Sequence, residues 1–118
     1  MTWQQIRDNA FNCGVCDERK IAVMAVIEYV PMGEGGMVVF SVKGNDLLVH
    51  QCDFKGNVDW HMYTVPLREV TDLKISIKLF GQKFRFKHKG QDFSFMNFGI
   101  AKPVKEMMAQ IEAEANNK

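Results

Sequence analysis

Cysteine and histidine are the residues of this chain best suited to metal or redox chemistry. Cys13 and Cys16 form a Cys-x-x-Cys pair, while His50 and Cys52 lie two positions apart and so share one face of a predicted strand. Together these four could form a Cys3His zinc set, since a structural zinc site usually takes four such ligands. However, the chain has no second Cys-x-x-Cys pair, and a redox pair normally lies near a βαβ unit, which is not predicted here. We therefore expect a connector without cofactor, and a small metal- or thiol-dependent protein using Cys13 and Cys16 remains the alternative.

The histidines do not assemble into a catalytic motif. His50, His61 and His88 fall on three different predicted strands, and no Ser-His-Asp or Cys-His arrangement can be built around them from the sequence. We expect them to be ordinary sheet residues, and we expect the protein not to be an enzyme.

A basic segment is the strongest functional feature. The sequence between Leu73 and Gln91 contains no acidic residue, although the formal net charge of the whole chain is only +1. Such a local field can attract an anionic surface, but lysines on a solvated sheet face also prevent aggregation. The six basic residues of this segment are Lys74, Lys78, Lys83, Arg85, Lys87 and Lys89.

We predict that four of these residues, Lys83, Arg85, Lys87 and Lys89, form a binding surface for an acidic protein partner. Anionic lipid is the weaker alternative. Nucleic acid is not expected, because Phe84 and Phe86 alternate to the face opposite these cations, whereas single-stranded nucleic acid requires exposed aromatic rings among them.

Strict alternation over residues 73–79 and 84–88 predicts strands of an antiparallel sheet that is dry on one face. Leu73, Ile75, Ile77 and Leu79 are expected to share the dry face, and the phenylalanines of residues 84–95 are expected to fill the interior. A C-terminal helix starting near Ala101 or Lys102 should cover that face with an apolar stripe. The stripe is predicted to comprise Ile100, Val104, Met107, Met108 and Ile111.

The remaining chain supplies four more predicted strands, at residues 21–30, 37–42, 47–54 and 58–65, separated by Gly-rich turns. Trp60 and Met62 are expected to share one face of the fourth. Thr2 and Gln5 predict a capping box at the start of a short N-terminal helix. The predicted fold is therefore mainly β, with seven antiparallel strands, a C-terminal helix and a short extra N-terminal helix.

Length and composition set the broad class. With 118 residues, of which 47% are hydrophobic, we expect a single domain over residues 1–118. Its parts are a helix and connector at 1–20, a β-barrel at 21–98 and a capping helix at 100–115. Three cysteines indicate a reducing compartment. We find neither a signal peptide nor an apolar run long enough to be a transmembrane segment, and we expect a cytoplasmic protein.

The order of seven strands and one helix resembles bacterial pleckstrin-homology-like and GRAM-type domains. The most telling part is Tyr63-Thr-Val-Pro-Leu-Arg-Glu-Val-Thr-Asp-Leu-Lys-Ile75, in which an apolar-Pro-Leu phrase ends one strand and Val70 leads into the next. The resemblance covers about residues 21–111, and it implies a binding or assembly module that acts through a protein partner or self-association.

One departure from that family bears on the ligand. Lipid-binding members of the wider superfamily carry several Lys and Arg around the loop between the first two strands. The corresponding loop here, Pro31-Met-Gly-Glu-Gly-Gly36, contains one acid and no base. Because phosphoinositide head groups require such donors, phosphoinositide binding is not expected at this place.

Overall fold

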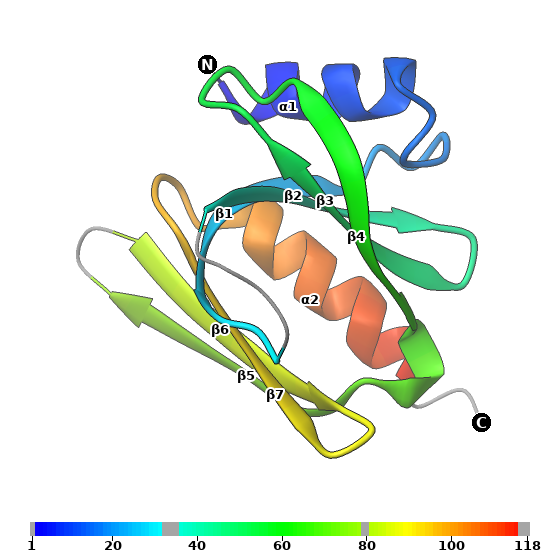
Figure 1. Cartoon of the computed structure of the whole chain (residues 1–118), viewed down its shortest axis with the longest axis vertical. Helices are drawn as coiled ribbons and strands as arrows, with labels where there is room; N and C mark the ends of the chain where they lie inside the picture. The colour runs from blue at the N-terminus through cyan, green and yellow to red at the C-terminus, as the bar shows by residue number, and fades with distance from the viewer. Residues whose placement is uncertain (1, 32–35, 79–80, 116–118) are drawn as a thin grey trace.

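The computed structural model describes residues 2–31, 36–78 and 81–115, without the side chains of Lys78 and Ala115. It contains seven strands and two α-helices, with one turn of 3-10 helix, η1, between the fourth and fifth strands (Figure 1). The elements are α1 (Trp3–Asn12), β1 (Ala22–Tyr29), β2 (Met37–Lys43), β3 (Asp46–Cys52), β4 (Val58–Pro66), η1 (Leu67–Glu69), β5 (Thr71–Lys78), β6 (Gly81–His88), β7 (Gln91–Asn97) and α2 (Lys102–Ala115).

All seven strands belong to one sheet, in the order β4-β3-β2-β1-β7-β6-β5. Every pairing between neighbours in this order is antiparallel. The first strand therefore lies at the centre of the sheet, and β4 and β5 form its two edges. The predicted fold class is confirmed, and the arrangement is consistent with a pleckstrin-homology-like sandwich.

The inner face of the sheet and α2 enclose the main core. Phe40 from β2 contacts the rings of Phe84 and Phe95 edge-on, with centroids 5.1 and 4.3 Å apart. The phenylalanines of β6 and β7 fill the interior, as predicted. In Figure 1 the second helix lies between the two halves of the curved sheet. Its core residues are Val104, Met107, Met108 and Ile111.

Two residues predicted to join this core do not. Ile100 precedes the first turn of α2 and is 57% exposed, so the predicted apolar stripe was wrong at that residue. Ile77 is 56% exposed, although Leu73 and Ile75 of the same strand pack against the core. Ile77 lies on the edge strand β5, where the β5–β6 hairpin extends away from the second helix (Figure 1). Leu79 lies outside the described residues.

A second, smaller core lies on the opposite face of the sheet, beneath α1 and the connector that follows it. It explains why β1 carries apolar residues on both faces. Its buried members come from α1, the connector and the first three strands: Ala10, Val15, Cys16, Ala22, Val39 and Cys52, with Met24, Met37 and Val58 packed at its border.

Strand β4 departs from its predicted alternation. Trp60 is 54% exposed, whereas Met62 packs against the main core, so the two do not share the predicted environment. The pairing of β3 with β4 shifts register on both sides of His50. Such irregularities break the two-residue period that the prediction assumed.

The N-terminal helix is capped as predicted. Thr2 Oγ1 accepts a hydrogen bond from the Gln5 backbone N–H at 3.2 Å, and Gln5 Oε1 accepts one from the Thr2 backbone N–H at 2.8 Å. Neither helix among the described residues is long and apolar enough to span a membrane.

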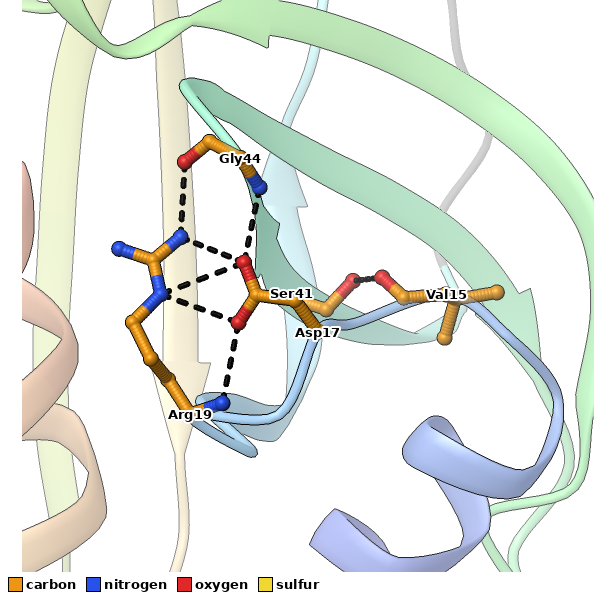
Figure 2. A network of polar contacts seen from close by, with 5 residues as sticks. All are labelled: Val15, Asp17, Arg19, Ser41 and Gly44. Carbon is orange, nitrogen blue, oxygen red and sulfur yellow. Dashed lines mark hydrogen bonds and ion pairs between the residues drawn. The ribbon is translucent and has the colours of Figure 1, made fainter.

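Polar contacts fasten the connector to the β2–β3 hairpin (Figure 2). Asp17 accepts from the Arg19 guanidinium at 2.7 Å and from the Gly44 backbone N–H at 2.9 Å, and the same guanidinium donates to the Gly44 carbonyl. Deeper in, Ser41 Oγ donates to the Val15 carbonyl at 2.6 Å. We call the contacts of Asp17, Arg19 and Gly44 the connector clasp.

Candidate functional site

The predicted basic surface lies on the outer face of β6, but only three of its four residues belong to the strand. Phe84 and Phe86 are buried in the core, so Lys83, Arg85 and Lys87 project outward. Lys89 follows the end of β6 and has a positive φ of 53°, which places it in the turn to β7. The tight turn therefore ends the alternation of β6 before this residue.

Neighbouring strands bring acids to this face that the basic segment itself lacks. Glu28, near the end of β1, forms an ion pair with Lys83 Nζ at 3.3 Å and accepts a hydrogen bond from Ser94 Oγ at 2.9 Å. Asp92, on β7, lies 3.9 Å from Lys87 Nζ. Two of the four predicted binding cations therefore already have carboxylate partners within the protein.

Arg85 differs from these two lysines. Its register partner on β5 is Lys74, and its partner on β7 is Ser94, which in turn lies opposite Tyr29 on β1. Lys74, Arg85, Ser94 and Tyr29 thus form a row across four strands on one face of the sheet. Within the part of the chain that the structure describes, neither Lys74 nor Arg85 forms an ion pair.

This row lies in a surface hollow of about 570 Å³. The Lys74 and Arg85 side chains are exposed there, and Tyr29, 55% exposed, supplies an aromatic wall. The hollow is lined by Tyr29, Asp72, Lys74, Arg85, Phe86, Lys87, Asp92, Phe93 and Ser94. We call it the β5–β7 hollow.

The chemistry of the β5–β7 hollow is that of anion recognition. Like charges directly opposite on adjacent strands destabilise a sheet, so Lys74 beside Arg85 is an arrangement that a bound anion would relieve. A guanidinium can also grip a carboxylate with two parallel hydrogen bonds. The lining residues include no histidine or cysteine. The hydroxyl of Ser94 donates a hydrogen bond to the Glu28 carboxylate.

The cysteines lie away from this hollow. Cys13 is exposed, while Cys16 and Cys52 are buried in the second core. Burial raises the pKa of Cys16, and it raises the pKa of Cys52 to about 11. Both buried thiols are therefore protonated at neutral pH, a state that disfavours nucleophilic chemistry. No cluster of three or more Cys, His, Asp or Glu side chains suited to a metal ion occurs within residues 2–31, 36–78 and 81–115.

The three histidines lie in two environments. His50 and His61 face one another across β3 and β4, with ring centroids 5.1 Å apart. On the other half of the sheet, His88 Nε2 lies 2.9 Å from Glu69 Oε1 of η1. Nothing local to His50 or His61 predicts their contact, because it depends on the register of β3 with β4.

The sequence matches no protein-family model and no curated protein.

Several residues of the hollow were missed by sequence reasoning. Tyr29 reaches the hollow, and Glu28 reaches Lys83 beside it, through the pairing of β1 with β7, which shifts register between Ile27 and Tyr29. Nothing local to either residue indicates that pairing. Lys74 was recognised as basic, but its direct opposition to Arg85 depends on the β5–β6 register. The predicted loop at Pro31–Gly36 and its Met32 lie largely outside the described residues, which resume at Gly36.

Proposed function

We propose that the protein is a non-catalytic binding or assembly module of pleckstrin-homology-like fold that acts in the cytoplasm through contact with a protein partner. The carrying observation is the Lys74–Arg85 pair, two exposed cations in direct register that lack ion partners among the described residues. Arg85 is the central binding residue of this proposal. Lys83, Lys87 and Lys89 are steering charges around it, since rim charges mainly set association rate and salt sensitivity.

The β5–β7 hollow favours a shaped acidic protein surface over a flat anionic one. Asp72 and Asp92 lie in its lining beside the cations, so a partner must present its carboxylates in register with Lys74 and Arg85 and avoid these two acids. A uniformly anionic lipid surface would also place negative charge against both acids, which would repel it. Tyr29 offers the apolar contact that the cations cannot supply.

The test compares charge-reversed variants in partner binding. Proteins captured from the source cell would be measured against the wild type, Arg85→Glu and Lys74→Glu. Each reversal should weaken binding by about 1.5–3 kcal/mol, which is typical of one hydrogen bond to a charged group. Wild-type binding should also weaken between about 0.1 and 1 M salt, as the Debye length falls from about 10 to about 3 Å.

Lys105→Glu is the matched control. Lys105 is exposed on α2, on the other side of the sheet from the hollow, so its reversal changes the net charge equally without touching the row. Equal affinity of all three reversed variants would refute the hollow as the docking surface. Binding of the wild type to anionic vesicles, with loss in Arg85→Glu, would assign the hollow to lipid, and concentration-dependent dimerisation lost in that variant would assign it to self-association.

A further inference from the structure

The His50–His61 pair lies outside the proposed docking surface and is not explained by it. Val49 is fully buried in the main core, so its neighbour His50 projects to the outer face of β3. His61, its register partner on β4, is exposed at the edge of the sheet. The two rings are inclined at 71° to one another.

The hydrogen bonding of the two rings leaves one nitrogen of each ring available to a ligand. His50 Nδ1 is enclosed and has no hydrogen-bond partner among the described residues. His61 Nε2 lies 2.7 Å from Thr64 Oγ1, and when it donates to that hydroxyl, Nδ1 of the same ring keeps its lone pair. A buried polar atom without a partner is unfavourable, so the pair contains an unused ligand atom.

We propose that His50 and His61 form an open two-histidine site for a divalent transition-metal ion of the zinc class. Two imidazoles bound to one tetrahedral ion at about 2.0–2.1 Å hold their ring centres roughly 5 Å apart, which is the spacing of this pair. Imidazole nitrogen is a preferred ligand of such ions.

The surroundings support this assignment. Thr64 takes the role of the outer partner that orients a ligating histidine. Because no third Cys, His, Asp or Glu ligand is grouped with them among the described residues, water completes the coordination on the exposed side.

The site is tested by titrating the full chain with zinc chloride in a non-chelating buffer and measuring the heat of binding by calorimetry. Zinc is the suitable probe because it has no redox chemistry and leaves the exposed Cys13 thiol unoxidised. The wild type is expected to bind one ion per chain. Binding should be lost in His61→Ala and His61→Gln, both at an exposed position that the fold does not require. Thr64→Val should weaken it by about 10–100-fold, as for other outer partners.

Two control variants distinguish binding at this pair from binding at other side chains of types that can ligate zinc. Cys13→Ser and His88→Ala should bind as the wild type does, because Cys13 follows the end of α1 and His88 contacts Glu69. Loss of binding in Cys13→Ser would place the ion on the thiols and overturn the proposal. Absence of saturable binding, or its persistence in both His61 variants, would overturn it too and leave the rings as an edge-to-face contact. None of these results depends on the β5–β7 hollow.

Discussion

Arg7 Nη2 donates to Glu106 Oε2 at 2.7 Å and joins the two helices of the protein. The Arg7 side chain is only 14% exposed, whereas that of Glu106 is 40% exposed. The guanidinium also lies 4.8 Å from the centre of the Trp3 ring, and Lys102 Nζ lies 5.5 Å from the centre of the same ring. This contact therefore ties the N-terminal helix to the helix that closes the main core.

Removing the ion pair should destabilise the protein modestly. Arg7→Ala is expected to cost about 1–3 kcal/mol of unfolding free energy, because it removes a nearly buried charged donor together with its packing on Trp3. In a double-mutant cycle with Glu106→Ala, the coupling energy should be only about 0.2–1 kcal/mol, since the carboxylate is partly exposed and screened by solvent. Urea unfolding measures both quantities, and a coupling energy of zero would show that the pair adds nothing to stability.

The second helix should be required for stability. Met107 is fully buried in the main core, so Met107→Asp places an unpaired charge among apolar side chains and should cost several kcal/mol. Ala109→Asp, at an exposed position of the same helix, is the matched control and should cost far less. Thermal unfolding compares the two. A soluble Met107→Asp variant that melts with the wild type would contradict the packing described above.

The connector clasp should make stability sensitive to acid. The Arg19 side-chain hydrogen bonds, followed by the Gly44 backbone N–H, hold the pKa of the Asp17 carboxyl well below its usual range. A depressed folded-state pKa means that its stabilisation is complete above the unfolded value of about 3.9 and is lost as pH falls below it. Asp17→Asn should therefore lose stability at neutral pH and flatten the decline below about pH 4.

Melting temperature as a function of pH checks this expectation. Asp59→Asn is the control, because Asp59 is exposed on β4 and makes no side-chain hydrogen bond or ion pair within the described part of the chain. The clasp would have no energetic role if the wild type and Asp17→Asn lost stability in parallel as the solution is acidified.

Local sequence patterns predicted the elements well, because each signal needs only a few neighbouring residues. The alternation at 84–88, the capping box of Thr2 and Gln5, and the stripe from Val104 to Ile111 all appear in the structure. A local pattern states which side chains share a face. It does not state what covers that face, and Ile77 was misplaced for this reason, whereas Ile100 was misplaced because it precedes the first turn of α2.

The candidate site was less predictable, since it depends on contacts between distant segments. The basic segment contains no acid, yet Glu28 and Asp92 reach its lysines from two other strands. The charge of the basic segment in the sequence therefore overstated the net positive charge of the surface that it forms in the fold. Arg85 was identified, but its isolation from acids could be recognised only once the register of β5, β6 and β7 was known.

Because of the second core, the labelling rates of the three thiols should report how often the N-terminal segment opens locally. Cys13 is exposed and should react with a thiol reagent at once, whereas Cys16 of the connector and Cys52 of β3 are buried in the second core. If α1 and its connector detach from the sheet in one local unfolding event, both buried thiols should become reactive at the same rate, well before the main core unfolds. Equal, slow labelling rates for these two, accelerated together in Asp17→Asn, would measure how often the N-terminal segment detaches from the sheet.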